Sequence, residues 1–307
     1  MSRTHILLIF LLLPLTLRSQ EDICIGKELV LYSTVLQEER SYWIHLPEHY
    51  NMDTKQRYPV VYLLDGDSFF HSLVGIRKTL ASGRGKYLPP CIIVGVLNSD
   101  RTRDFTPTAS AAGRDGKISI DAIPQGGGSE AFSKFLTEEL RPAIDSAYRT
   151  NGWNMLIGHS YAGLFTLNTF LRHTELFDTY LAVDPSLWWD QGRLVREAEA
   201  LVAGRDFKGK SLYIGVASKK RTDRVDIHLD KVSYLLSEVL PQAENLRFFS
   251  KSFPDENHGT VAVPVYMTGL NNYSENEKIL CESTFMAIDT FWHYYCDCLP
   301  DRGDSRL

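Results

Sequence analysis

The chain has 307 residues, of which 44% are hydrophobic and 23% are charged, and its formal net charge is −5. This is the composition of an ordinary globular protein with enough residues for one large core. The negative charge and the lack of a basic tract argue against nucleic acid as a partner. Five cysteines are too few for a disulfide scaffold in a chain of this length.

The first twenty residues have the pattern of a secretory signal peptide. A short basic start precedes an apolar run of twelve residues, Ile6–Leu17. A helix that spans a bilayer needs about 20 apolar residues. We therefore expect cleavage near Ser19 or Gln20 and a mature chain of residues 21–307 that is periplasmic or secreted and does not stay inserted in a membrane. An uncleaved membrane anchor is the alternative.

The cysteines indicate neither a metal nor a cofactor. Cys91 opens an apolar run, CIIVGVL, and is expected to be a buried free thiol. One or two disulfides among the other cysteines would persist after export. No CxxC pair and no matched histidines accompany Cys296 and Cys298, which makes a zinc site a weak alternative.

Short apolar runs bounded by turn residues predict the strands. The first two, Leu29–Val35 and Tyr42–Leu46, resemble a hairpin. The later runs are similar to one another, and the uniform hydrophobicity of the first, Tyr58–Leu64, suits a strand buried on both faces of a parallel sheet. They are Tyr58–Leu64, Ile92–Leu97, Asn154–Ile157, Tyr180–Val183, Leu212–Val216 and Leu246–Ser250.

Helical patterns lie between these runs. Apolar residues recur at helical spacing from Ser129, a plausible N-cap, to Tyr148. Further helices are expected over Tyr161–Arg172, Arg193–Val202, Val225–Leu240 and Leu280–Tyr295. Strands that alternate with helices predict a single α/β domain with a mostly parallel sheet and helices on both faces. Two long segments, 98–128 and 184–192, interrupt the pattern and are candidates for functional loops.

The stretch LIGHSYAG places Ser160 between a predicted strand and a predicted helix. In a nucleophile elbow the serine occupies a strained turn, and its neighbours must be small. Gly158 and Ala162 fit this requirement, although the usual pattern has glycine in place of Ala162. The amide of Tyr161, at the start of the following helix, can help to bind an oxyanion. A simple turn serine is the alternative.

A serine nucleophile needs a general base. In α/β hydrolases the base is a histidine that follows the last core strand. His258 lies in PDENHGT, directly after the last predicted strand, and is our candidate. His159 adjoins the serine, but neighbouring side chains on such a turn point apart, so packing is its expected role.

Five segments of this chain occur in the order seen in a known family. They are YLLDGDSF, RDFTP, GHSYAG, DPSLWWD and FPDENHGT. Together they resemble the putative-esterase family of α/β hydrolases, and in particular its siderophore-esterase-like branch. The resemblance covers about residues 28–295 and implies the α/β-hydrolase fold.

The resemblance also implies roles for further residues. Ser160 would be the nucleophile and His258 the base. Gly66 or Asp67 would supply the second oxyanion amide. The substrate site would be lined by Arg103, Phe105, Trp188 and Trp189. One of the two tryptophans is expected to lie in the core.

The carboxylate that would complete a Ser–His–acid triad is the residue that the sequence defines least. Hydrolases of this fold often place it after the strand predicted at Leu212–Val216, where Asp223 is the nearest carboxylate and Asp226 the next. We predict Asp223. Asp184, after the preceding strand, and a Ser–His pair without an acid are the alternatives.

These residues predict a serine esterase that hydrolyses a small-molecule carboxylic ester through an acyl-enzyme. An arginine and aromatic side chains would suit an anionic or aromatic substrate. Two other functions stay open at this stage. One is a protein that binds a siderophore or glycan without turnover, and the other is an acyltransferase with a sugar acceptor.

Overall fold

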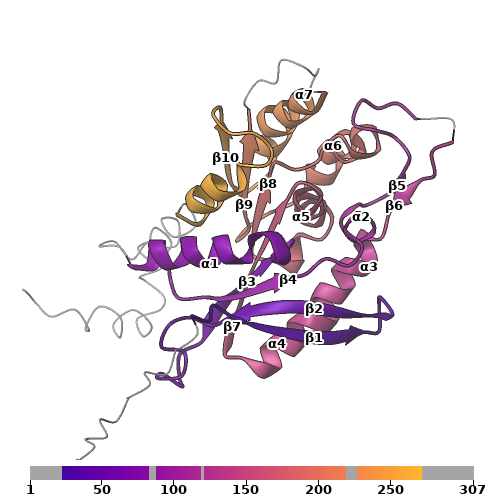
Figure 1. Ribbon diagram of the computed structural model, residues 1–307. Helices are drawn as coiled ribbons and strands as arrows, with labels where there is room; N and C mark the ends of the chain where they lie inside the picture. The colour runs from indigo at the N-terminus through magenta and orange to yellow at the C-terminus, as the bar shows by residue number, and fades with distance from the viewer. Residues whose placement is uncertain (1–22, 83–87, 119–120, 219–226, 272–307) are drawn as a thin grey trace, which may run out of the picture.

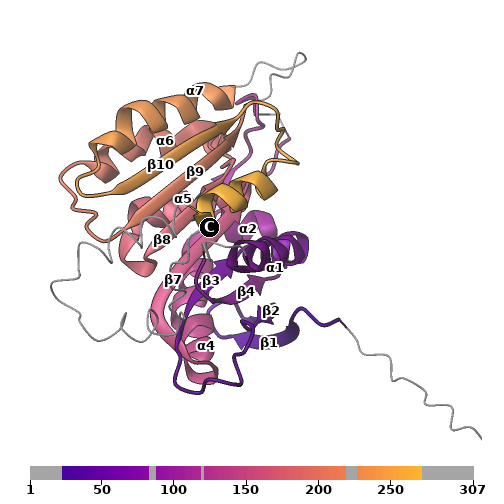
Figure 2. The ribbon, with the colours of Figure 1, turned by 90° about the vertical axis from the view of Figure 1, so that its left-hand side faces the viewer.

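The computed structural model describes residues 23–82, 88–118, 121–218 and 227–271. One eight-stranded sheet runs through these residues in the order β1-β2-β4-β3-β7-β8-β9-β10, with helices on both of its faces (Figures 1 and 2). The predicted signal peptide, the predicted helix at Leu280–Tyr295 and three of the five cysteines lie outside the described residues.

An antiparallel hairpin forms one edge of the sheet, as predicted. It consists of β1 (Lys27–Ser33) and β2 (Glu38–His45), and β2 also pairs antiparallel with β4. The other strands are parallel, namely β3 (Tyr58–Leu63), β4 (Ile92–Val96), β7 (Thr150–His159), β8 (Thr179–Val183), β9 (Ser211–Ala217) and β10 (Arg247–Phe253). This arrangement confirms the predicted α/β class.

Two helical layers cover the sheet. The helices are α1 (Gly66–Ser82), α2 (Arg101–Phe105), α3 (Ser129–Lys134), α4 (Arg141–Ala147), α5 (Tyr161–Arg172), α6 (Trp189–Val202) and α7 (Ile227–Tyr234). A π-helical turn, Phe135–Leu140, joins α3 to α4, and another, Leu235–Val239, follows α7. The helix α1 and the helical residues 262–271 lie on one face, whereas α3, α5 and α6 lie on the other (Figure 1).

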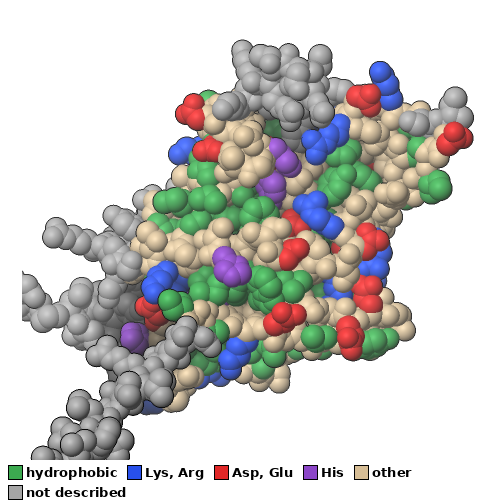
Figure 3. Space-filling model, viewed as in Figure 1, with side chains coloured by type: hydrophobic (Ala, Val, Ile, Leu, Met, Phe, Trp, Pro, Cys, Tyr) green, Lys and Arg blue, Asp and Glu red, His purple; other side chains and the backbone are tan. Residues whose placement is uncertain are grey.

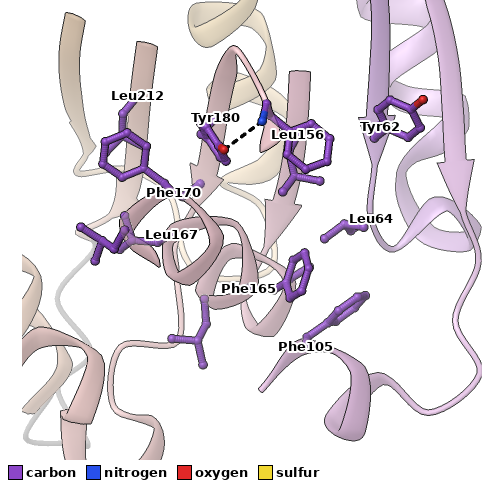
Figure 4. Packing of buried hydrophobic residues seen from close by; sticks show 14 of the residues in the cluster. Tyr62, Leu64, Phe105, Leu156, Phe165, Leu167, Phe170, Tyr180 and Leu212 are labelled. Carbon is purple, nitrogen blue, oxygen red and sulfur yellow. Dashed lines mark hydrogen bonds between the residues drawn. The ribbon is translucent and has the colours of Figure 1, made fainter. Parts of the chain in front are cut away.

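Successive residues of the central strands point to opposite faces, which gives the protein two apolar clusters. In and just after β3, Tyr62 and Leu64 pack toward α3 and α5, and Leu63 packs toward α1. Figure 4 shows the first cluster, in which Phe105 lies beside Phe165 of α5. Burial on both faces explains the uniformly apolar strands. Cys91 is a buried free thiol, as predicted, and burial raises its pKa to about 11.

Some local predictions differ from the structure. The N-cap of α3 is Gly128, not Ser129, which is the first helical residue and is buried. The predicted loop at 98–128 contains α2 and a small hairpin of β5 (Ala109–Ser110) and β6 (Gln125–Gly126). Among the described helices, none combines the length and apolar character that a membrane span requires.

Candidate active site

Ser160 lies on a sharp turn between β7 and α5, at the carboxyl edge of the sheet. Its backbone has φ 63° and ψ −116°, a conformation that L-residues rarely adopt. A Cβ atom at Gly158 would lie 2.2 Å from the carbonyl oxygen of Ala162, so only glycine fits there. The turn therefore has the backbone geometry of a nucleophile elbow, which the sequence predicted.

Ala162 takes the position where the usual motif has its second glycine. Its methyl group is fully buried, and the next residue, Gly163, carries the close approach instead. A Cβ atom on Gly163 would lie 2.8 Å from the carbonyl oxygen of Val183 in β8. The elbow therefore tolerates alanine at 162 because the tight contact with β8 occurs one residue later.

His258 contacts the serine directly. Its Nε2 lies 3.0 Å from the hydroxyl oxygen of Ser160, although the two residues are 98 positions apart. On the other side of the ring, Nδ1 lies 2.6 Å from a carboxylate oxygen of Asp184. A carboxylate accepts hydrogen bonds, so Nδ1 carries the proton and Nε2 is free to accept the serine proton.

Asp184 is thus the carboxylate that orients the histidine, in the position that the sequence analysis gave to Asp223. It follows β8 directly, has φ 41°, and is almost fully buried. Its other oxygen accepts the backbone N–H of Ala217, at the end of β9, at 3.1 Å. Asp223 lies outside the described residues. Asp184 was one of the alternatives left open, and its place directly after the strand next to β7 was the signal in the sequence.

Ser186, which was not among the predicted site residues, contacts Ser160 directly. Its hydroxyl oxygen lies 3.2 Å from that of Ser160, and its backbone N–H donates to the Ser160 carbonyl at 3.0 Å. Because the Ser160 hydroxyl donates to His258, the Ser186 hydroxyl is placed to donate to the Ser160 oxygen. The segment after β8 therefore supplies both the acid and a second hydroxyl beside the nucleophile.

The short loop after β3 leads directly into Gly66 and Asp67, the predicted oxyanion residues, which are the first residues of α1. It lies next to the elbow, because β3 pairs with β7 and the N–H of Leu64 donates to the Ile157 carbonyl at 2.9 Å. A Cβ atom on Gly66 would lie 2.6 Å from the backbone of Gly95, so glycine is required at this position. Both residues open α1, where backbone N–H groups have no partner within the helix.

Arg101 joins this loop to the elbow. Its guanidinium donates to both carboxylate oxygens of Asp65, at 2.6 and 2.9 Å, and to the carbonyl of His159 at 3.1 Å. Asp65 is buried and has φ 54°. The ion pair therefore fixes a strained residue that directly precedes the predicted oxyanion amides. Arg101 was not among the predicted site residues.

Two predicted substrate residues have other partners. Arg103 forms ion pairs with Glu38 and Asp104, and the hydrogen bond from Arg103 holds the pKa of Glu38 at about 2. Phe105 is only 1% exposed and packs against Phe132 and Phe165, so its ring cannot reach a substrate. In the short helix α2, Arg101 is the residue that contacts the site, through the carbonyl of His159 and the ring of Tyr161.

The tryptophan pair divides between core and surface, as predicted. Trp189 is buried, and its ring N–H donates to the Thr108 carbonyl at 3.0 Å. Trp188 is partly exposed, and its ring lies 5.7 Å from the ring of Tyr161. The guanidinium of Arg114 lies over Trp188 at 5.3 Å. Tyr161, Trp188 and Arg114 thus form a cationic and aromatic patch next to the nucleophile.

The surface around these residues is mixed in character. Between α1 and α6, histidine side chains lie beside Lys and Arg side chains, with hydrophobic side chains next to them (Figure 3). Within the described part of the chain, no group of three or more His, Cys, Asp or Glu side chains is arranged to hold a metal ion. The arrangement suits serine chemistry on an ester that carries an anionic or aromatic group.

Known proteins are similar to this chain in sequence and in fold. The family described as "Putative esterase" matches residues 33–252. The ferri-bacillibactin esterase BesA of Bacillus subtilis is 32% identical over 179 residues, which are 54% of this chain and 61% of BesA. The match therefore spans less than two thirds of BesA. The siderophore enterobactin esterase of Emericella nidulans is 26% identical over 245 residues, 68% of this chain and 80% of that protein.

A solved structure extends the likeness to the fold. The crystal structure of an IroE-like serine hydrolase from Shewanella oneidensis superposes with a TM-score of 0.76 and is 33% identical, covering 81% of this chain and 80% of that one. Because the family match spans more than half of the chain, this protein belongs to the putative esterase family and has the α/β-hydrolase fold.

Proposed function

We propose that this protein is a serine esterase that cleaves the ester bonds of a siderophore. The observation that carries the proposal is the continuous hydrogen-bonded chain from the Ser160 hydroxyl through His258 to the buried carboxylate of Asp184. A histidine held in this tautomer between a carboxylate and a serine is the arrangement that activates a hydroxyl for attack on a carbonyl carbon.

In the proposed reaction, His258 takes the Ser160 proton as the serine oxygen attacks the ester carbonyl. The backbone N–H groups of Tyr161 and of Gly66 or Asp67 bind the resulting oxyanion. His258 then donates its proton to the leaving alcohol, and an acyl-enzyme remains on Ser160. Water attacks the acyl-enzyme with His258 again acting as the base, and the carboxylic acid leaves. Asp184 stabilises the imidazolium in both halves of the cycle.

Two observations support a siderophore ester as the substrate. The relatives are named for the hydrolysis of ferri-bacillibactin and enterobactin. The patch of Tyr161, Trp188 and Arg114 combines ring faces with a cation next to the nucleophile. Such a patch suits the anionic aromatic groups of catechol-type siderophores, because a guanidinium pairs with anionic oxygens and stacks on rings.

The alternative of a protein that binds a siderophore or glycan without turnover has less support. Its main argument was that the sequence shows no obvious acid beside the histidine, and the carboxylate of Asp184 lies 2.6 Å from Nδ1 of His258. Acyl transfer to a sugar differs from hydrolysis only in the acceptor, and no contact among the described residues favours a sugar over water.

We also propose that the protein acts after export, in the periplasm or outside the cell. The support is the basic start and the twelve-residue apolar run at the N-terminus. Fractionation of cells that produce the full chain, with N-terminal sequencing of the mature protein, tests this proposal. A mature protein that starts at Met1 in the cytoplasmic fraction would contradict it.

The esterase proposal is tested by turnover of catechol-siderophore lactones and of p-nitrophenyl butyrate by the wild-type protein and by Ser160→Ala. We expect the wild-type protein to hydrolyse both compounds, and we expect kcat of Ser160→Ala to fall by about 10⁴-fold or more. Equal rates for the two proteins would remove Ser160 from the reaction. Hydrolysis of p-nitrophenyl butyrate alone would retain the esterase and refute the siderophore substrate.

A further inference from the structure

His159 directly precedes the nucleophile, yet its ring makes its hydrogen bond to a different part of the chain. Its Nε2 lies 2.8 Å from the backbone carbonyl oxygen of His258. A carbonyl only accepts hydrogen bonds, so Nε2 of His159 carries a proton and donates it. The elbow thus holds the backbone of the histidine whose side chain serves the neighbouring serine.

The ring of His159 is itself held firmly. His159 as a whole is buried and only 8% exposed. The ring of Phe69 meets it edge to face at 5.3 Å, and the ring of His258 lies 4.6 Å away at an angle of 34°. A side chain packed on two sides has little freedom to rotate. The donor at Nε2 is therefore preorganised.

The turn that carries His258 has few other hydrogen bonds to the body of the protein. Asn257 accepts from the backbone N–H groups of Gly259 and Thr260 and donates its own N–H to the Thr260 hydroxyl. Apart from those of the His258 ring and the His258 carbonyl, the hydrogen bonds that the structure describes for residues 257–260 join residues of this turn and its immediate continuation. The bond from His159 is the one that ties the His258 backbone to the elbow.

We propose that His159 is a positioning residue for His258. By donating from its ring to the His258 carbonyl, His159 fixes the base relative to the nucleophile. Asp184 sets the rotation of the His258 ring, and His159 sets the place of the backbone from which that ring extends. Because Ser160 follows His159 directly, one short stretch of chain holds both reacting groups. This inference rests on the proposed esterase function.

The electrostatic surroundings agree with this role. Burial, followed by the neighbouring His258, lowers the pKa of His159 to about 4. His159 is therefore uncharged at neutral pH, with its single proton on Nε2. An uncharged ring does not repel the imidazolium that His258 becomes during the reaction, whereas a second cation at this distance would.

The test compares three variants at position 159. The amide nitrogen of Gln can reach the position of the imidazole Nε2, whereas the shorter Asn reaches only that of Nδ1, and Phe keeps the ring without any donor. We expect His159→Asn and His159→Phe to lower kcat about 10- to 100-fold with little change in KM, since a displaced catalytic group costs about this much. We expect His159→Gln to restore kcat to within about threefold of the wild-type value.

A second measurement does not depend on turnover. We expect hydrogen exchange of the backbone amides in residues 254–260 to be faster in His159→Asn than in the wild-type protein and His159→Gln. Equal kcat and equal exchange in all variants, while Ser160→Ala is inactive, would overturn this inference alone. Equal losses in Gln and Asn would show that the ring acts by packing and would overturn it as well. If hydrogen exchange changes as expected but Ser160→Ala turns over substrate as fast as the wild-type protein, the proposed function is refuted instead.

Discussion

Asp184 and His258 are 74 positions apart, and a carboxylate oxygen of one lies 2.6 Å from Nδ1 of the other. The second oxygen of Asp184 accepts the N–H of Ala217, so the carboxylate is held from both sides. Asp184→Asn would keep an oxygen for Ala217 but would present an N–H group to His258. The histidine would then carry its proton on Nε2 and could not accept one from Ser160.

We therefore expect Asp184→Asn to fold normally and to lower kcat by about 10³- to 10⁴-fold. Steady-state kinetics with p-nitrophenyl butyrate measure this change. Asp223→Asn is the matched control, because it makes the same substitution at the carboxylate that the sequence analysis favoured. We expect its kcat to equal the wild-type value. A large loss in Asp223→Asn together with a small one in Asp184→Asn would reverse the assignment.

The contact between Ser160 and His258 could be predicted from the sequence, whereas Asp184 was only one of several alternatives. The difference lies in how local each signal is. The elbow needs small residues beside the serine, and this requirement is visible in five consecutive letters. The acid depends on which strand end lies nearest His258, and this is set by the strand order and by the twist of the sheet. Strands β8 and β9 are neighbours and both end near the site, so Asp184 and Asp223 were both consistent with the sequence.

The contacts of Arg103 and Phe105 could not be predicted from the sequence, for a similar physical reason. The helix α2 has five residues, too few for apolar periodicity to show which side faces the core. Its direction is set by tertiary contacts, in which Phe105 enters the core and Arg103 pairs with Glu38. By contrast, the inner parallel strands were predicted well, because burial on both faces leaves a uniformly apolar run. The strand β10 lies at the edge of the sheet, and its middle residues are exposed.

The ion pair of Arg101 with Asp65 leads to a second prediction. Arg101→Met would leave the nearly fully buried carboxylate of Asp65 without its charged partner. Since breaking a buried pair from one side typically costs 3–5 kcal/mol and Arg101 is partly exposed, we expect unfolding in urea to show a loss of about 3 kcal/mol. We also expect kcat of the folded variant to fall about 10-fold or more, because the residues before Gly66 lose the side-chain tie that Arg101 makes to the elbow.

Two further variants separate these effects. The double variant with Asp65→Asn removes the unpaired charge, so it should recover part of the stability but not the activity. Arg103→Met also removes an arginine of α2 from an ion pair, but that pair lies with Glu38 and Asp104. We expect it to lower stability and to leave kcat of the folded protein unchanged. An equal loss of kcat in both arginine variants would contradict a specific role for Arg101.

The pair of Glu38 and Arg103 gives a prediction about pH. The folded-state pKa of Glu38 is held at about 2, below its ordinary value of 4.5, by hydrogen bonds from Arg103 and then Arg40. A lowered carboxylate pKa contributes stability that is complete above pH 4.5 and is lost as the pH falls toward 2. We expect Glu38→Gln to lose about 1 kcal/mol at pH 7, since the pair is partly exposed, and to lose less stability than the wild-type protein between pH 5 and pH 3. Urea unfolding at several pH values measures the free energy of unfolding of each protein. The substitution Glu39→Gln, at an exposed neighbouring position, is the control. If the free energies of Glu38→Gln and the wild-type protein fell in parallel with pH, the prediction would be contradicted.

The stacking of Arg114 on Trp188 predicts how the substrate is selected. Within the described residues Arg114 forms no salt bridge, so its charge is available to an anionic group near the nucleophile. We expect Arg114→Gln to raise KM about fivefold for an anionic aryl ester, which corresponds to the loss of about 1 kcal/mol from a partly exposed cationic contact. We expect KM for p-nitrophenyl butyrate to stay unchanged. Lys117→Gln removes the same charge from a highly exposed position in the same loop and should change neither value. If Lys117→Gln raised KM for the anionic ester as much as Arg114→Gln, the effect would come from overall charge and not from a specific contact at Trp188.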